Sequence, residues 1–233
     1  MLTDAQLQQI MPNLAAAKRA LLLPHLNRAM QDHRVDTALR CAAFVAQLAH
    51  ESGEFRWMEE IWGPTAAQLR YEPPADLARR LGNTEPGDGK RFKGRGPIQI
   101  TGRFNYAKYG ELLGVDLVAD PARAAAPELA FATAGLYWQS NGLNELADQR
   151  QFVAITRRIN GGTNGLAERQ RYYERAQAVL GTGPAPRGGA RALRLPRGYE
   201  AIVADQASRR PVAKKSAPRK PAARKPAGRG ARA

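Results

Sequence analysis

The stretch that decides the fold is a helical segment with an acidic end, Asp36-Thr37-Ala38-Leu39-Arg40-Cys41-Ala42-Ala43-Phe44-Val45-Ala46-Gln47-Leu48-Ala49-His50-Glu51-Ser52-Gly53. Asp36 and Thr37 carry the side-chain oxygens that cap a helix start. Gly53 is a typical stop, because glycine readily adopts the left-handed conformation that ends helices. The apolar residues between them recur at helical spacing and mark one buried stripe. We therefore predict a core helix whose final turn places Glu51 at the edge of the core.

Helix signals continue on both sides of this segment, whereas strand signals are scarce. Thr3-Asp4 caps a short helix that ends near Pro12, and Pro24 is expected to separate a helix over 14–23 from the next one. Further helices are predicted at 65–81 (broken at Pro73-Pro74), 104–113, 127–141, 151–159 and 166–180, with a loop over 82–96. Residues 98–101 fit part of a small hairpin. The sequence predicts a mainly α-helical domain over 1–180 with at most a small β-hairpin.

The charge of the chain is lopsided, although its composition is that of an ordinary soluble globular protein. Of the 233 residues, 43% are hydrophobic and 24% are charged. Residues 181–233 hold 14 lysines and arginines against two acidic residues, and so supply +12 of the net charge of +15. This Pro-, Ala- and Gly-rich segment cannot bury enough apolar surface to offset its ordering entropy. We predict a disordered basic tail over 181–233.

The cysteine and histidine content excludes several kinds of site. Cys41 is the one cysteine, which excludes an intramolecular disulfide, a cysteine redox pair and a cysteine-based metal site. The helical zinc-protease pattern needs a second histidine four residues after His50, where Glu54 stands. The chain also lacks a Gly-x-Ser-x-Gly elbow, and residues 93–96 lack the ending of a phosphate loop. We expect no metal and no other cofactor.

The remaining groups that can carry chemistry are four carboxylates near the end of the core helix: Glu51, Glu54, Glu59 and Glu60. Hydrolysis of a glycosidic bond needs one carboxyl group to give a proton and another to organise water. We interpret Glu54 and Glu59 as solvated surface charges. The Ala-rich face before Glu51, with Phe55 and Trp57 after it, predicts partial desolvation of Glu51, which suits a general acid. From the residues alone, Glu51 can be interpreted equally well as a catalytic acid or as a charged residue at a helix end.

Three separated motifs occur in order within residues 3–180: Ala49-His50-Glu51-Ser52-Gly53-Glu54-Phe55-Arg56, then Gly94-Arg95-Gly96-Pro97-Ile98-Gln99-Ile100-Thr101-Gly102-Arg103-Phe104-Asn105-Tyr106, then Arg158-Ile159-Asn160-Gly161-Gly162-Thr163-Asn164-Gly165. Together they resemble glycoside hydrolase family 19, and its bacteriophage endolysin branch more closely than the plant chitinases. The resemblance implies a lysozyme-like, mainly α-helical fold and hydrolysis with inversion.

The resemblance also implies roles for individual residues. Glu51 matches the general acid, and Glu60, nine positions downstream, matches a glutamate implicated in the endolysin branch. The plant enzymes carry their base further along, so Glu59, Glu85 and Asp88 stay open as the second carboxylate. The residues expected to bind substrate are His50, Arg95, Gln99, Thr101, Asn105, Asn160 and Arg169.

Without the resemblance, Asn160 is a turn former and Arg169 a surface helix residue. The carboxyl groups of an inverting pair stand roughly 6.5–9.5 Å apart to admit a water. Glu51 and Glu60 can meet this requirement only if the chain reverses at Ser52-Gly53.

These features predict a peptidoglycan-degrading, endolysin-like glycosidase that cuts β-1,4 bonds between N-acetylated amino sugars. One alternative is a chitinase acting on N-acetylglucosamine polymers. An alternative of another class is a protein that binds nucleic acid or the anionic envelope and whose hydrolase domain is inert. The basic tail is expected to bind anionic envelope polymers or, without sequence preference, nucleic acid.

The amino-terminal residues indicate where the protein is made. They lack the cationic start and the apolar stretch of a secretory signal. No apolar run approaches the roughly 20 residues that cross a bilayer. We expect a monomer that is made in the cytoplasm and acts on a cell wall after release, in the setting of host-cell lysis.

Overall fold

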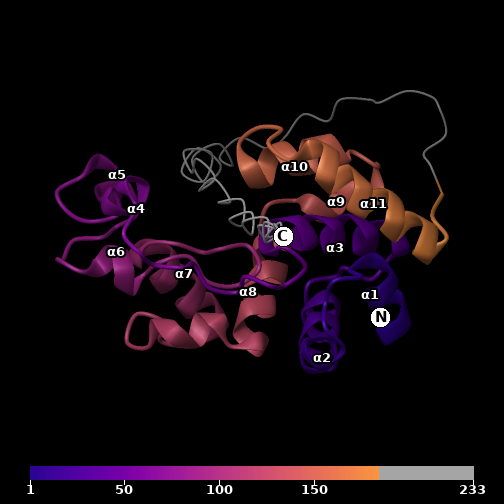
Figure 1. Cartoon of the computed structure of the whole chain (residues 1–233), viewed down its shortest axis with the longest axis horizontal. Coiled ribbons are helices and arrows are strands. Elements are labelled where there is room, and N and C mark those ends of the chain that lie inside the picture. The colour runs from indigo at the N-terminus through magenta and orange to yellow at the C-terminus, as the bar shows by residue number, and fades with distance from the viewer. Residues whose placement is uncertain (184–233) are drawn as a thin grey trace, which may run out of the picture.

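The computed structural model describes residues 1–183, which form helices joined by loops (Figure 1). The first part of the chain contains α1 (Asp4–Ile10), α2 (Ala16–Asp32), α3 (Ala38–Ser52), α4 (Ala66–Leu69), α5 (Asp76–Arg80) and α6 (Asp88–Arg91). The second part contains α7 (Arg103–Leu113), the 3-10 helix η1 (Pro121–Ala125), α8 (Pro127–Ser140), α9 (Leu143–Asp148), α10 (Phe152–Asn160) and α11 (Leu166–Leu180). The mainly α-helical fold class is confirmed.

α3 is the central core helix, as predicted. It packs against α11 on one side, and α1 and α2 lie on its other side (Figure 1). The Thr37 side chain accepts a hydrogen bond from the Arg40 N–H at its start, and Gly53 ends it in the left-handed conformation, with φ of 59°. Residues 41–49 are all buried, and the Phe44 ring meets the edge of the Trp138 ring at 5.1 Å. Burial of one such aromatic side chain contributes about 1.5–3 kcal/mol, so α3 anchors the domain.

The segment after α3 turns back on the helix end. Gly53, Glu54 and Phe55 adopt three successive left-handed conformations, with φ near 60°. The Trp57 N–H then donates to the Ser52 carbonyl at 2.9 Å. Phe55 is fully buried against Phe131, with ring centroids 5.0 Å apart. The chain therefore turns at the place that the candidate mechanism requires.

Four local features differ from the expectations. α2 runs through Pro24 without a break, whereas two helices were predicted. The predicted loop over 82–96 contains the short helix α6, and α9 was not predicted. In the described part of the chain, extended pairing is limited to two isolated bridges, Glu59 with Arg95 and Arg95 with Ile100, in place of a hairpin.

The physical reason for the continuous α2 is the position of Pro24 on an exposed face. Proline has no N–H, so the Ala20 carbonyl loses its partner within the helix. Ala20 and Pro24 are both exposed, and water can satisfy that carbonyl. Packing of α2 on α8 supports the rest of the helix.

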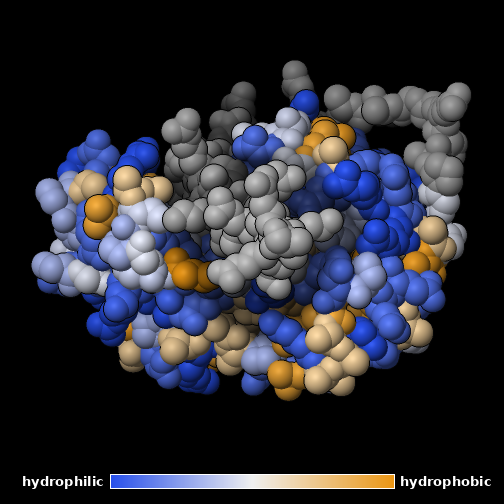
Figure 2. Space-filling model, in the orientation of Figure 1, coloured by the Kyte–Doolittle hydropathy of each residue, from blue (hydrophilic) through white to orange (hydrophobic). Residues whose placement is uncertain are grey.

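Helices α4, α5 and α6 lie at the end of the molecule opposite α1 and α2, with α7 and α8 between the two groups (Figure 1). Hydrophilic residues dominate the face seen in Figure 2, at both ends. Within residues 1–183, no helix has the length and apolar character needed to cross a bilayer. Almost all of the predicted tail, residues 184–233, lies outside the described residues, and the domain boundary at 180 stays a prediction.

Candidate active site

Glu51 stands in the last turn of α3 and is held by a buried arginine. Its Oε1 pairs with Nη2 of Arg169 on α11 at 2.5 Å. The Arg169 side chain is 2% exposed and the Glu51 side chain 25% exposed. Nη1 of Arg169 donates to Oε1 of Gln47 at 2.5 Å, and Nε donates to the Asn164 carbonyl at 3.2 Å. These contacts fix the guanidinium, and the guanidinium fixes one oxygen of Glu51.

Gln47 lies one helical turn before Glu51 on the same face of α3. Its Nε2 donates to Oγ1 of Thr156 on α10 at 2.8 Å, and both side chains are fully buried. Neither residue was predicted. The sequence does contain a signal for Gln47, because it is a polar residue inside the apolar stripe of the core helix, four positions before Glu51 and therefore on the same helix face.

His50 packs where α3 meets the start of α11. A Cβ added at Gly165 would come within 2.4 Å of the His50 ring, so the ring lies directly on the Gly165 backbone. Its Nδ1 is 2.8 Å from Oε2 of Glu168. Nδ2 of Asn160 donates to the Asn164 carbonyl at 3.2 Å, the same carbonyl that Arg169 uses.

Three of the predicted substrate-binding residues thus gather around the predicted acid. Together with the residues that contact them, they form a set that we call the Glu51 cluster: Glu51, Gln47, His50, Thr156, Asn160, Asn164, Glu168 and Arg169.

Glu60 is held by neutral N–H donors. Its backbone N–H donates to the Gly94 carbonyl at 2.8 Å, and the Gly94 N–H returns a bond to Oε2 of Glu60 at 2.9 Å. Nε2 of Gln68 donates to the other oxygen, Oε1, at 2.9 Å. Both carboxylate oxygens therefore accept a hydrogen bond, and the carboxylate has a fixed plane.

The predicted residues of the second motif belong to or contact the loop that carries Gly94. A Cβ on Gly94 would lie 2.6 Å from Oε1 of Gln99, so this side chain rests on Gly94. Oγ1 of Thr101 donates to the Gln99 carbonyl at 2.9 Å, and Nδ2 of Asn105 donates to the Thr101 carbonyl at 2.8 Å. Thr101 and Asn105 are buried, so these bonds support the backbone of the loop. We call this second set the Glu60 cluster: Glu60, Gln68, Gly94, Gln99, Thr101 and Asn105.

Arg95 belongs to this loop and is buried. Its Nε pairs with Oε1 of Glu59 at 3.0 Å, and its Nη1 donates to the Tyr106 hydroxyl at 2.8 Å. Lys93 also pairs with Glu59, at 3.2 Å. Two cations thus contact Glu59, whereas neutral donors contact Glu60. Arg95 is placed to support the loop that carries Gly94.

The other carboxylates considered have structural partners or lie on the surface. Asp88 is buried and pairs with Arg103 at 2.6 Å. Burial raises the pKa of Asp88, but the hydrogen bonds from Arg103 and from two backbone N–H groups outweigh it, and the net pKa lies below the ordinary value. Glu85 is exposed.

The interpretation of Glu54 as a solvated charge is wrong. Glu54 is 5% exposed, and Oε2 accepts the Asn13 N–H at 2.6 Å. Oε1 accepts Nδ2 of Asn13 and the Tyr172 hydroxyl, each at 2.9 Å. This carboxylate ties the turn after α3 to the α1–α2 loop and to α11. The partners lie far away in sequence, which is why the local pattern did not reveal them.

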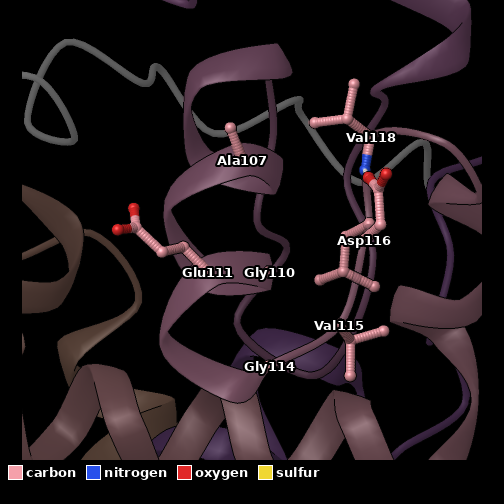
Figure 3. Close-up of a pocket in the computed structure, with 8 residues that line it drawn as sticks. Ala107, Gly110, Glu111, Gly114, Val115, Asp116 and Val118 are labelled. Carbon is pink, nitrogen blue, oxygen red and sulfur yellow. Dashed lines mark hydrogen bonds between the residues drawn. The ribbon is translucent and has the colours of Figure 1, made fainter.

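None of the predicted site residues lines either of two hollows in the structure, although Glu168 of the Glu51 cluster lines the second. One is an apolar depression of about 330 Å³ between α7 and the segment 114–118 (Figure 3). Gly110 permits the close approach of α7 to this segment, since a Cβ there would meet the Val115 carbonyl oxygen at 2.5 Å. The other, of about 150 Å³, is polar and is lined by Glu54, Arg171 and Arg175 among others. In residues 1–183, no three His, Cys, Asp or Glu side chains gather closely enough to hold a metal ion.

The comparisons with known proteins decide the family. The family model of the class I chitinases, glycoside hydrolase family 19, matches residues 31–149, which is just over half of the chain. The chain belongs to this family. It is therefore a glycoside hydrolase, as predicted from the three motifs.

Relatives in bacteria and plants share this domain. A glycosyl hydrolase family 19 domain-containing protein of Haemophilus influenzae is 38% identical over 156 residues, which cover 57% of this chain and 76% of that protein. The endochitinase At2g43610 of Arabidopsis thaliana is 43% identical over 123 residues, 52% of this chain and 39% of that protein. The chain thus spans three quarters of the first relative and well under half of the second.

The crystal structure of chitinase C from Streptomyces griseus has the same fold. It superposes with a TM-score of 0.62 at 26% identity, covering 78% of each chain. The lysozyme-like helical fold of family 19 is thereby confirmed. These relatives are bacterial and plant proteins, and the endolysin part of the expectation stays a prediction, as do the roles of the site residues.

Proposed function

We propose that the protein hydrolyses β-1,4 bonds between N-acetylglucosamine units of a chitin-type polymer, with inversion. Family membership and relatives named as chitinases support this substrate. The observation that carries the proposed mechanism is the contrast between the two clusters. Glu51 has one charged partner and partial exposure, whereas Glu60 has neutral donors on both oxygens.

In this mechanism Glu51 gives its proton to the oxygen of the leaving sugar. Arg169 already contacts Oε1 of Glu51, and this contact strengthens as the proton leaves and negative charge develops on the carboxylate. Glu60 takes a proton from a water that attacks the opposite face of the sugar ring at C1. The products are two shorter chains, and the new reducing end has the inverted anomeric configuration.

Single amide substitutions test the two assignments. Glu51→Gln and Glu60→Gln should each lower kcat on a soluble N-acetylglucosamine hexamer by about 10²–10⁴-fold, the usual contribution of general acid–base groups. Glu59→Gln is the matched control next in sequence, since its carboxylate pairs with Lys93 and Arg95, and its kcat should change by no more than about threefold. Nuclear magnetic resonance of the fresh products reads the anomer. An active Glu51→Gln variant would contradict the assignment of Glu51 as the acid. A large loss of kcat in Glu59→Gln, together with an active Glu60→Gln variant, would assign the base to Glu59 instead of Glu60.

Peptidoglycan is the second candidate substrate, as the sequence predicted. The names of the relatives favour chitin, but the excess of positive charge in residues 181–233 suits a polymer in an anionic envelope. Digestion of purified peptidoglycan and of chitin, followed by reducing-end analysis, separates the two, because muramic acid and glucosamine ends differ chemically. Attachment of the full chain to whole cells should weaken as salt rises, since the Debye length falls from about 10 Å at 0.1 M to about 3 Å at 1 M.

A further inference from the structure

Gln68 is a buried amide whose contacts fix its orientation. It is 1% exposed, and its Oε1 accepts the Thr65 N–H at 3.0 Å. Its Nε2 donates to Oε1 of Glu60 and to the Ile61 carbonyl, both at 2.9 Å. A flipped amide would place its oxygen against two other oxygens and its NH₂ group against an N–H. The NH₂ group of Gln68 is therefore held in the orientation in which it donates to Glu60.

Part of this arrangement is an ordinary helix cap. Thr65 and Gln68 form a capping box at the start of α4, in which Oγ1 of Thr65 accepts the Gln68 N–H at 3.2 Å. The same box occurs in α1 between Thr3 and Gln6, with the same two distances of 3.0 and 3.2 Å. α1 lies at the other end of the molecule (Figure 1). Capping uses only the oxygen of the glutamine side chain, so the bond from Nε2 to Glu60 is an addition to the cap.

We propose that Gln68 is a positioning residue that holds Glu60 in the orientation needed to activate water; this rests on the proposed function. Gln68 and Gly94 approach Glu60 from different segments and donate to different oxygens. An ionised carboxylate has about four lone-pair sites. Two neutral donors fix its plane, leave sites for a water, and add no positive charge that would weaken a base. Gln68 is the buried residue of α4, which has four residues.

The deciding variant is Gln68→Glu. Glutamate can accept the Thr65 N–H, so the cap and the side-chain shape are kept. The donor to Glu60 is replaced by a second carboxylate, and the two groups then repel or share a proton. With the hexamer, kcat at neutral pH should fall about 10–100-fold, as for other misplaced catalytic groups, with KM nearly unchanged. The acid limb of the pH–rate profile should move to higher pH. The other charged or titratable groups around Glu60 are Glu59, Lys93, Arg95 and Tyr106, and this variant leaves them in place.

Two controls separate positioning from helix stability. Gln6→Glu makes the same change in the α1 box and should leave both kcat and the pH profile unchanged. Thr65→Ala removes the cap but keeps the donor, and should lower the unfolding midpoint without moving the acid limb.

Each outcome has a definite meaning. Wild-type kcat and pH profile in Gln68→Glu would overturn the proposal. A loss of kcat shared equally by Gln68→Glu and Thr65→Ala, with no shift of the limb, would reduce Gln68 to a structural role and overturn it as well. Full activity in Glu60→Gln would contradict the proposed base itself, which distinguishes failure of the proposed function from failure of the positioning.

Discussion

The four glutamates around the end of α3 differ in the partners of their carboxylates. Glu51 pairs with one arginine, Glu59 with two cations, Glu60 with two neutral N–H donors, and Glu54 with three neutral donors. All four lie within ten residues of sequence, yet two of these settings suit catalysis and one is purely structural. The partners, which come from α1–α2, α4, residues 93–95 and α11, give each carboxylate a different setting.

Glu54 gives the clearest prediction at the scale of the residue. Glu54→Gln should lower the free energy of unfolding by about 2–3 kcal/mol, because an amide NH₂ group would face donors that now bond to a carboxylate. Urea unfolding measures the change. Glu174→Gln is the control, since Glu174 lies exposed on α11 and should shift stability by less than about 0.5 kcal/mol. Equal stability of the two variants would show that the buried carboxylate contributes nothing.

The sequence predicted residue types better than residue contacts. His50, Asn160 and Arg169 do gather around Glu51, and Gln99, Thr101 and Asn105 support the loop whose Gly94 N–H donates to Glu60. The supporting glutamines were missed because their contacts are not local: Gln47 and Arg169 lie 122 residues apart. Gln68 had a local signal in the Thr65-x-x-Gln68 box, but that pattern predicts only a helix start.

At the scale of the element, the sequence rules for helix caps and stops predicted helices correctly where the start signal and the stop signal lie close together in the sequence. α3 followed from Thr37, the apolar stripe and Gly53. α1 and α11 also appeared where the pattern predicted them. The rule that proline separates helices failed in α2, because a helix packed on α8 tolerates one orphaned carbonyl on its exposed face.

Replacement of that proline should therefore stabilise the protein. Pro24→Ala restores an N–H for the Ala20 carbonyl and should raise the free energy of unfolding by about 1–3 kcal/mol, after allowance for a more flexible unfolded chain. Pro127→Ala is the matched control. Pro127 occupies the first position of α8, where a missing N–H costs nothing, so this change should not stabilise. Urea unfolding of both variants checks the difference.

At the scale of the whole molecule, the core contains acidic protons that the unfolded chain would release. Burial raises the pKa of the Cys41 thiol from 9.0 to about 12. Burial also raises the pKa of Tyr106 and Tyr173 above their ordinary value of 10.0. Above each ordinary value the unfolded state loses a proton that the folded state keeps, so stability falls as pH rises.

The loss should begin near pH 9 and steepen above pH 10. One such group contributes a slope of about 1.4 kcal/mol per pH unit between its two pKa values. Urea unfolding at intervals from pH 8 to 11 measures the slope. Cys41→Ala should abolish most of the slope between pH 9 and 10 while the tyrosine-dependent part above pH 10 remains. An unchanged slope in this variant would contradict the role given to the thiol.

The docking of α11 against α3 has a consequence for how the enzyme is made. Arg169, which pairs with Glu51, is translated 122 residues after Gln47, its other partner on α3. A nascent chain therefore carries Glu51 and Glu60 long before it carries Arg169, the counter-ion of Glu51. We expect a product that ends at a premature stop codon ahead of α11, or one cleaved there by a protease, to be inactive on glycan. Hydrolytic activity should then arise only in a chain translated past residue 169.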